Sequence, residues 1–390
     1  MTSTNKTRYR LGIDCRLAGS DNAGIGRYCE NLVRETIKIN QEKHLFHLVL
    51  FFRNLNQAKE VLGVDYYQNP AKYHLTIELV DIRHYSLKEQ LCLPKIYRRA
   101  QLDLLHVPHF NIPVFYRGNL VITIHDLLWH QQKGMQVTTL KPLVYYAKYL
   151  AYLMVVRLAV KRAKFILVPA HTIKDTVCHY YPQVQDKIIV TKEGIAEPYQ
   201  NNLNLVSAKK LAKKRIKKQL VYTGSLYPHK NIVLVLKALK KLPKYQLLVV
   251  GSRDVFQTQV RKLVARYKVK RQVRFLGYVP DQKLIKLYQE SLAVVQPSLS
   301  EGFGLTGIEA MASGTAVLAS DIPIFHEIYQ DHAFYFDPKD PTSFLSALEK
   351  VEFAERESII ANNLTFAKNY RWQDLAELSC RVYLTVLQSN

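Results

Sequence analysis

Short runs of apolar and β-branched residues alternate with segments of helical periodicity along almost the whole chain. This alternation constrains the fold more than any other feature. In the first half, strands are predicted at residues 9–13, 47–52, 102–107, 120–124, 165–168 and 188–190. The clearest helical patterns between them are at residues 25–39 and 138–162. Such β-α-β alternation is typical of a parallel sheet covered by helices, so we expect an α/β protein.

The alternation loosens once and then starts again, which indicates two domains. Residues 198–207 are polar and rich in asparagine, and a basic amphipathic stretch follows at 209–218. Further strands are predicted at residues 220–223, 246–250, 273–276, 292–296, 316–319 and 333–336, with helices at 231–240, 255–267, 282–290, 304–312, 342–351 and 372–387. We expect two doubly wound domains, residues 1–198 and 199–371, each with a ligand crevice at the carboxyl ends of its strands.

The net charge of +23 is concentrated in one part of the chain, because residues 201–300 carry 22 basic and only 3 acidic side chains. So basic a segment predicts an anionic partner: nucleotide phosphates, a polyanionic acceptor, anionic lipid head groups or nucleic acid. A well-solvated surface would explain many of the lysines equally well. The five cysteines are scattered, and residues 1–10 lack the apolar core of a signal peptide. We therefore expect a reducing, cytoplasmic location.

Two candidate positions for ligand contact lie in the first half. Gly24 and Gly26 stand between a predicted strand and a helix, where backbone can approach a phosphate closely. Their spacing is not G-x-G-x-x-G, and no acidic residue ends the next strand, which argues against an NAD enzyme. His125 directly follows the strand at 120–124, at the expected crevice edge. The alternative is a loop in which Asp126 caps the next turn.

In the second half, a cation stands close to a glycine turn. Gly224 and Ser225 follow the strand at 220–223, and Lys230 stands at the start of the next predicted helix. A positive charge beside a helix N-terminus suits a diphosphate. The spacing of a Walker P-loop is absent, so ATP hydrolysis of that type is not expected.

The most specific pattern is the sequence S-E-G-F-G-L-T-G-I-E-A at residues 300–310. Glu301 is predicted in a loop and Glu309 inside an otherwise apolar helix, where a carboxylate is costly unless it meets a partner such as ribose hydroxyls. Between them is a glycine-rich entry whose backbone N–H groups can receive phosphate oxygens, formed by Gly302, Phe303, Gly304 and Leu305. The chain contains no D-x-D pair, so a carboxylate-held divalent metal is not predicted.

Taken together, these motifs resemble the retaining glycosyltransferases of family 4. The likeness rests on residues 301–314, the glycine segment 24–28, the segment 223–231, residues 275–279 and the helix at 372–387. It covers nearly the whole chain in the family's order. It implies a GT-B fold, in which two Rossmann-like domains face each other across a cleft. It also implies that the last helix, with residues 372–390, returns to the first domain.

The resemblance implies that a hexosyl group moves, with retention, from a nucleotide-sugar donor to a glycan or lipid-linked acceptor, with no metal or cofactor. Carried over by position, Glu301 would bond hydroxyls of the donor sugar, Glu309 the nucleotide ribose and Lys230 the diphosphate. Gly304 and Leu305 would donate backbone N–H groups to the diphosphate.

In the first domain, the resemblance implies that Gly24 lets the backbone approach the diphosphate and that His125 contacts the sugar near the reacting carbon. One position departs from the family pattern: many members carry an arginine where this chain has Ser225. Either Lys230 therefore acts alone, or a second cation such as Arg27 or Arg253 assists it.

Three other interpretations stay open. A GT-B-type nucleotide-sugar epimerase or hydrolase would act without an acceptor. A nucleic-acid-binding protein would explain the charge, but we find no recognition-helix, RNA-recognition or OB-type motif. The tyrosine-rich segment 142–160, with Lys141 and Lys148, would suit a helix lying on the inner face of an anionic membrane, or one packed into the first domain. Charges at Lys148 and Arg157 argue against a spanning helix.

Overall fold

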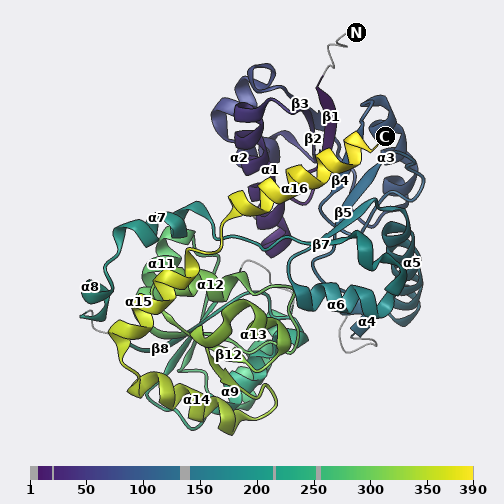
Figure 1. Ribbon diagram of the computed structural model, residues 1–390. Helices are drawn as coiled ribbons and strands as arrows, with labels where there is room; N and C mark the ends of the chain where they lie inside the picture. Colours follow the sequence, from purple (N-terminus) through teal and green to yellow (C-terminus); the bar gives the residue numbers. More distant parts are fainter. Residues whose placement is uncertain (1–7, 20–21, 132–140, 214–216, 252–255, 390) are drawn as a thin grey trace. The chain divides into compact units, whose positions relative to one another are not determined.

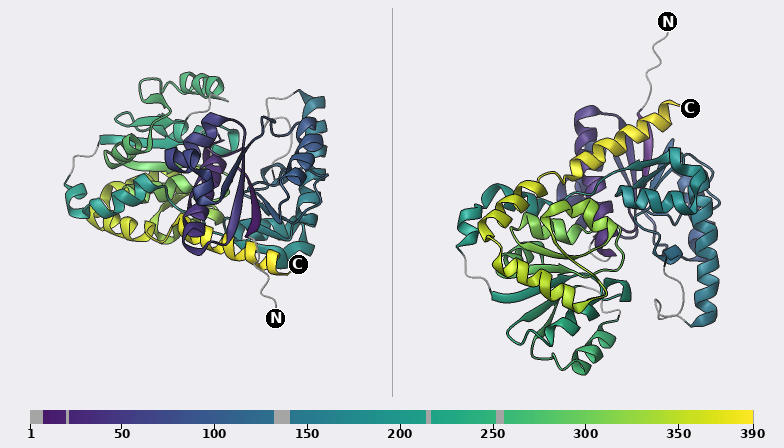
Figure 2. Two further views of the ribbon diagram at one scale, coloured as in Figure 1. Left: turned by 90° about the horizontal axis from the view of Figure 1, so that it is seen from above. Right: turned by 60° about the horizontal axis from the view of Figure 1, so that its bottom comes forward.

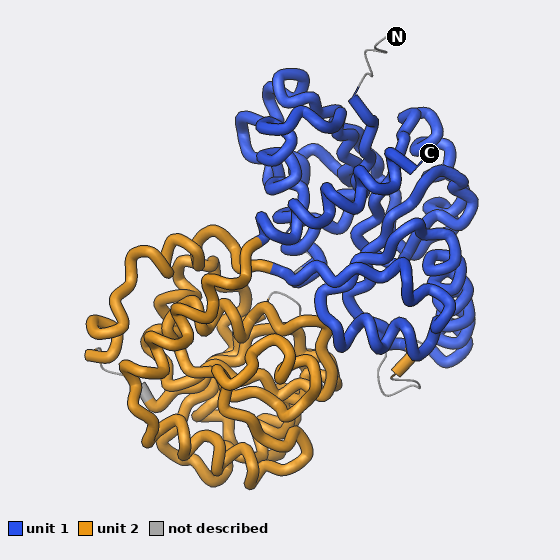
Figure 3. Tube along the Cα trace, in the orientation of Figure 1, with its two compact units in different colours: residues 1–129, 140–193, 372–390 blue, residues 130–139, 194–371 orange. Residues whose placement is uncertain are grey.

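The computed structural model describes residues 8–19, 22–131, 141–213, 217–251 and 256–389. The chain forms two compact units (Figure 3). Unit 1 contains residues 1–129, 140–193 and 372–390, and unit 2 contains residues 130–139 and 194–371. The predicted domain boundary, between residues 198 and 199, lies a few residues after the change of unit between 193 and 194. The resemblance also implied that the last helix returns to the first domain, and that helix lies in unit 1.

Unit 1 contains a seven-stranded parallel sheet with the order β3-β2-β1-β4-β5-β6-β7 (Figure 1). Its strands are β1 (Tyr9–Asp14), β2 (Phe46–Phe52), β3 (Leu75–Leu79), β4 (Leu104–Val107), β5 (Leu120–Thr123), β6 (Phe165–Val168) and β7 (Ile188–Val190). Its helices are α1 (Ala23–Lys43), α2 (Leu55–Gln68), α3 (Leu87–Arg99), α5 (Pro142–Arg162), α6 (His171–Tyr180) and α16 (Trp372–Gln388). The short helix α4 (Leu128–Gln131) is divided between the units, because unit 1 ends at Trp129 and unit 2 begins at His130.

Unit 2 contains a six-stranded parallel sheet with the order β10-β9-β8-β11-β12-β13. Its strands are β8 (Lys217–Thr223), β9 (Gln246–Val250), β10 (Val273–Gly277), β11 (Ser291–Gln296), β12 (Ala316–Ser320) and β13 (Phe334–Phe336). Its helices are α7 (Glu197–Leu205), α8 (Ala208–Ala212), α9 (Ile232–Leu239), α10 (Gln257–Arg266), α11 (Asp281–Gln289), α12 (Leu305–Ala312), α13 (Pro323–Tyr329), α14 (Pro341–Phe353) and α15 (Arg356–Ala367).

The inner strands are buried along most of their length, because helices cover the parallel sheets. In β2, six of the seven residues of the sequence FHLVLFF are buried. The last helix, α16, belongs to the core of unit 1 and lies beside α1 in Figures 1 and 2. Its Tyr383 hydroxyl lies 2.6 Å from Nδ1 of His106 on β4. The final residues of the chain therefore complete the first unit.

The structure also corrects parts of the sequence-based assignment. It adds α2, β3 and α3 between residues 53 and 100, and α13 and α15 in unit 2. The amphipathic stretch at 209–218 is not one helix, because α8 ends at Ala212 and β8 has begun by Lys217. Residues 138–140 of the predicted helix at 138–162 lie outside the described residues.

One helix among the described residues, α5, is long and apolar enough by length and composition to cross a membrane. Its most apolar window has a mean hydropathy of 1.4, and 28% of that window is buried inside the protein.

Candidate functional site

The sheet of unit 2 has a switch point between β8 and β11. From β8 the chain builds outward to β9 and β10 on one side, and then returns to add β11, β12 and β13 on the other. At such a point the loops after two neighbouring parallel strands diverge and leave room for a ligand. The loop after β8 contains Gly224, Ser225 and Lys230, and the loop after β11 contains Ser298 and Glu301.

An ion pair joins these two loops. The ammonium of Lys230 lies 2.6 Å from both carboxylate oxygens of Glu301, and the hydroxyl of Ser298 donates to the same carboxylate at 2.7 Å. The backbone N–H of Leu299 donates to the carbonyl of His229 at 2.7 Å. The Lys230 and Glu301 side chains are 21% and 12% exposed, so the pair is partly screened from water yet within reach of a ligand.

The surroundings of the pair fix its charge state. Burial alone would raise the pKa of Glu301, but the charge and hydrogen bonds of Lys230 and the hydroxyl of Ser298 hold this pKa below its ordinary value. Burial, together with the charge of Lys230, lowers the pKa of His229 to about 4. At neutral pH, therefore, Glu301 is ionised and His229 is uncharged. The pair presents one cation and one anion side by side.

Glycines at the start of α12 make room for a tyrosine. The Tyr329 hydroxyl donates to the carbonyl of Gly304 at 2.6 Å. A Cβ atom on Gly304 or on Gly307 would clash with this tyrosine. Gly304 also has a φ of +100°, which favours glycine. These two positions therefore shape the turn that places the N-terminus of α12.

The first turn of α12 presents backbone donors. The first N–H groups of any helix have no acceptor one turn earlier in the helix. Here the N–H of Gly307 donates to the carbonyl of Gly304 at 3.0 Å, and no side chain caps this end of α12. Leu305 lies in this turn and is partly exposed, as are Gly302 and Gly304 before it. Phe303 instead points into the protein and packs edge-on against Tyr370, with ring centroids 6.0 Å apart. The Phe303 side chain is therefore part of the packing of unit 2.

Glu309 lies inside α12 and is only 4% exposed, as the sequence pattern predicted for a carboxylate within an apolar helix.

Gly224 has a φ of +147°, and a Cβ atom on Gly251 would clash with the carbonyl of Gly224. The ends of β8 and β9 therefore approach closely at two glycines. Ser225 is half-buried, and its carbonyl accepts a hydrogen bond from the Tyr222 hydroxyl. Arg253, a suggested second cation, lies outside the described residues.

In unit 1, Gly24 and Gly26 lie in the first turn of α1 rather than in a loop before it. Gly24 has open space where a side chain would stand, whereas a Cβ on Gly26 would clash with the carbonyl of Gly19. Gly26 is therefore required for a close backbone approach, and Gly24 leaves the start of the helix open.

His125 is buried at the carboxyl end of β5, and both of its ring nitrogens face protein oxygens. Nε2 lies 3.1 Å from the carbonyl of Pro108, and Nδ1 lies 3.5 Å from a carboxylate oxygen of Glu193. The ring of Tyr28 packs edge-on against the imidazole at 4.6 Å. A sugar hydroxyl would have to replace one of these oxygens to bond to the ring. Asp126 accepts from the N–H of Leu128 at 3.1 Å, which is the capping arrangement expected for it.

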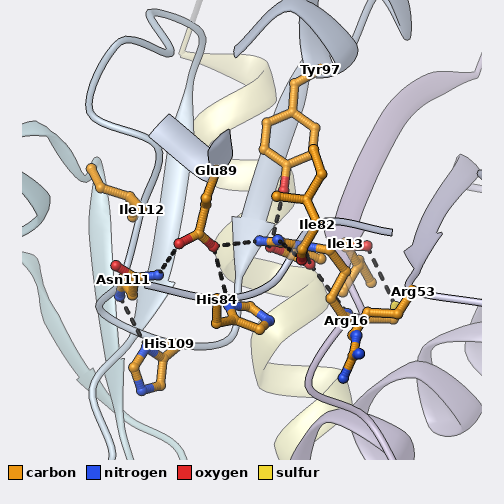
Figure 4. A network of polar contacts seen from close by, with 12 residues as sticks. Ile13, Arg16, Arg53, Ile82, His84, Glu89, Tyr97, His109, Asn111 and Ile112 are labelled. Atoms are coloured by element: carbon orange, nitrogen blue, oxygen red, sulfur yellow. Dashed lines mark hydrogen bonds and ion pairs between the residues drawn. The ribbon is translucent and has the colours of Figure 1, made fainter. Parts of the chain in front are cut away.

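A buried ionic network, which sequence reasoning missed, lies at the end of β1 (Figure 4). The guanidinium of Arg16 contacts the carboxylates of Asp14 at 2.7 Å and Glu89 at 2.9 Å, and all three side chains are almost fully buried. Tyr97 donates to Asp14 at 2.9 Å, and the amide of Asn111 donates to Glu89 at 2.8 Å. The network joins β1, α3 and the loop after β4 near the switch point of unit 1. No sequence signal separates these charged residues from surface ones.

The predicted site residues thus fall into two groups. Lys230 and Glu301 are in direct contact in unit 2, and the other predicted residues of that unit lie around its switch point or in α12. Gly24, Gly26 and His125 belong to unit 1. Ser298 and Tyr329 support the unit 2 site but carried no motif. Within the described ranges, no three His, Cys, Asp or Glu side chains group closely enough to hold a metal ion.

Sequence and structure comparisons identify relatives. The sequence model of the family "Glycosyl transferases group 1" matches residues 206–366. The chain is 30% identical over 266 residues to the O-antigen chain mannosyltransferase RfbU of Salmonella typhimurium, covering 67% of this chain and 68% of the relative.

Two solved structures share the fold over nearly the whole chain. Sucrose-phosphate synthase of Thermosynechococcus elongatus has a TM-score of 0.70 at 18% identity, covering 98% of this chain and 100% of that protein. HepE of Anabaena, solved with UDP and glucose, has a TM-score of 0.66 at 17% identity, covering 97% and 100%. In both cases the likeness extends over the two units of this chain. The chain therefore belongs to the glycosyl transferases group 1 family and is a glycosyltransferase with the GT-B fold.

Proposed function

We propose that this glycosyltransferase moves a hexosyl group from a nucleotide-sugar donor to a glycan or lipid-linked acceptor, with retention of configuration and without a metal ion. The observation that carries the proposal is the contact between Lys230 and Glu301 at the switch point of unit 2. A cation near a helix N-terminus suits a diphosphate, and an ionised carboxylate suits sugar hydroxyls.

In this proposal unit 2 binds the donor. Lys230 and the N–H groups of Gly304 and Leu305 face the diphosphate, and the backbone at Gly224 and Ser225 lies against it. Because an ammonium has three donors, Lys230 can contact a phosphate oxygen and keep one bond to Glu301. Glu301 then has an oxygen free for the sugar. The buried Glu309 is assigned to the ribose hydroxyls. The presence of UDP and glucose in the HepE structure supports a nucleotide-sugar donor.

The reaction separates charge. The bond between the sugar C1 and the diphosphate oxygen breaks, so the sugar becomes cation-like while negative charge grows on the leaving group. Lys230 and the start of α12 stabilise that growing charge where it appears. The acceptor hydroxyl attacks from the face the diphosphate leaves, and its proton passes to a departing phosphate oxygen. The products are the new glycoside and a nucleoside diphosphate. No protein nucleophile is needed, which fits Glu301 as a hydroxyl ligand.

Unit 1 is assigned to the acceptor, with His125 near the reacting carbon and Gly24 and Gly26 beside the diphosphate. The name of RfbU, an O-antigen chain mannosyltransferase, supports a glycan acceptor in polysaccharide synthesis. We place the reaction in the cytoplasm, at the inner face of the membrane where a lipid-linked acceptor would be found.

A donor screen tests the proposal. The purified chain is heated with UDP-, GDP-, dTDP- and ADP-sugars, with GDP-mannose first because of the likeness to RfbU. A donor at about 100 times its Kd should stabilise the fold by roughly 2.7 kcal/mol and raise the Tm by several degrees. The matching nucleoside diphosphate should be released only when an acceptor is present. Release without an acceptor would instead indicate an epimerase or hydrolase, and no shift with any donor would contradict the proposal.

A further inference from the structure

A part of unit 1 outside the proposed chemistry combines exposed apolar and basic side chains. It consists of α3, the loop at residues 112–117 and α5, here called the α3–α5 surface. Gln90 on α3 bonds the loop at the carbonyl of Ile112 and the N–H of Val114, at 3.2 and 2.8 Å. Arg162 at the end of α5 donates to the carbonyl of Val114 at 2.9 Å. These bonds hold both helices against one loop.

Large apolar side chains are unusually exposed here. In the described part of the chain, half of the large hydrophobic residues that are exposed lie on this surface. Among them are Leu143, Leu150 and Met154 on α5, Leu87 and Leu91 on α3, and Phe115 in the loop. Leu143 is 87% exposed and Leu150 67%. Positions 143, 150 and 154 share one helix face, so these side chains form a stripe rather than isolated points.

The charges on this surface have a single sign. Exposed cations lie on all three parts of this surface: Lys88 and Lys95 on α3, Arg117 in the loop, and Lys148, Arg157 and Lys161 on α5. Of these, Arg157 and Lys161 continue the face of α5 that carries positions 143, 150 and 154. The sequence of α5 contains no acidic residue, and the one acid of α3, Glu89, is buried against Arg16. A second copy of the chain would bring like charges together, which is unfavourable. An anionic partner with an apolar interior satisfies both features.

The opposite side of α5 is packed into the protein. Tyr145 is 2% exposed, and Val156, Ala159 and Val160 are fully buried. A spanning orientation would remove these residues from unit 1 and carry Lys148 and Arg157 into the hydrocarbon. The helix is therefore suited to lie along an interface, with its leucines at the acyl boundary and Arg157 and Lys161 at the phosphates.

We propose that the α3–α5 surface docks unit 1 on an anionic lipid bilayer. This deepens the proposed function, on whose membrane location it rests, by naming the surface that would meet the bilayer. A membrane position would also bring the enzyme to acceptors carried on lipids.

Flotation of the full chain with vesicles tests the proposal. Vesicles of phosphatidylcholine alone are compared with vesicles containing about one-third phosphatidylglycerol. We expect binding to the anionic vesicles that weakens as salt rises. The variant Arg157→Gln/Lys161→Gln should bind about 25-fold more weakly, from roughly fivefold per cation. The variant Leu143→Gln/Leu150→Gln should lose about tenfold for each leucine.

Matched controls alter equally exposed residues of unit 2. Lys240→Gln/Lys262→Gln removes two cations, and Leu205→Gln/Phe353→Gln removes two exposed apolar side chains. Both controls should bind vesicles as the parent does. Absence of binding, equal binding to neutral vesicles, or equal loss in the controls would overturn the proposal. The proposal would also be overturned if the chain formed a dimer that the variant Leu143→Gln/Leu150→Gln abolishes. The donor-induced thermal shift should be unchanged in every variant, so a failure here is distinguishable from a failure of the proposed function.

Discussion

Lys230→Met separates a role in donor binding from a role in holding two loops together. The substitution keeps most of the side-chain length and removes the charge. In the free protein it leaves the Glu301 carboxylate with the hydroxyl of Ser298 but without its cation. Because Lys230 is 21% exposed, we expect a loss of about 1–3 kcal/mol, less than for a fully buried pair. The Tm should fall by several degrees.

The catalytic effect should be much larger. An ammonium about 4 Å from a phosphate charge is worth roughly 4 kcal/mol at an effective dielectric of about 20. Loss of one donor that stabilises developing negative charge lowers kcat by about 100- to 1,000-fold. We therefore expect turnover with a confirmed donor to fall by that factor in Lys230→Met. Rapid-mixing or radiolabel assays at saturating donor would measure it.

The double variant Lys230→Met/Glu301→Gln distinguishes the two roles. It removes both charges, so no unpaired carboxylate remains and the Tm should recover, while activity should not. Lys218→Met breaks the ion pair with Glu352, which lies elsewhere in unit 2 at 3.0 Å, and should change neither quantity much. Recovery of both stability and turnover in the double variant would refute the reasoning. The ion pair would then serve only as a structural contact that holds the two loops together.

Four further outcomes follow from the structure. Gly304→Ala should lower stability by about 1–3 kcal/mol and reduce donor binding, since the new methyl meets Tyr329 at a left-handed backbone position; an unchanged melting curve would contradict this. Arg16→Met should cost about 3–5 kcal/mol in chemical denaturation, because it leaves two buried carboxylates unpaired. Burial alone would raise the pKa of the Asp14 carboxyl, but Arg16 lowers this pKa from 3.8 to about 2. The lowered pKa should add about 2 kcal/mol to the free energy of unfolding above pH 4, and this contribution should be lost as the pH falls toward 2. Urea titrations of Asp14→Asn should lack this pH dependence. Turnover should persist in EDTA, and a dependence on added Mg²⁺ or Mn²⁺ would rule out the metal-independent route.

Much of the fold could be predicted from the sequence, because parallel strands covered on both faces are read as continuous apolar runs. The elements between residues 53 and 100 could not. Only the first residue of β3 is buried, α2 is interrupted by the non-helical Gly63, and α3 contains Pro94. Each weakens the periodicity on which the prediction depends.

Sequence motifs name candidate site residues one by one, but they do not give the contacts between them. Lys230 and Glu301 stand 71 positions apart, and sequence could place each only after its own strand. That the two bond to each other follows from the strand order of the sheet. Arg16 and Glu89, 73 positions apart, are read as surface residues until the structure shows them buried. Ser298 and Tyr329 belong to no motif, and only three-dimensional proximity reveals their support of the site.

Hydrogen–deuterium exchange of the full chain, with and without the donor identified by the screen, tests the central claim most directly. We expect slower exchange at residues 224–231 and 298–306 of unit 2 when donor binds. We also expect Lys230→Met to lose this protection at the same donor concentration. Protection confined to other segments, with these two loops unchanged by a bound donor, would contradict it.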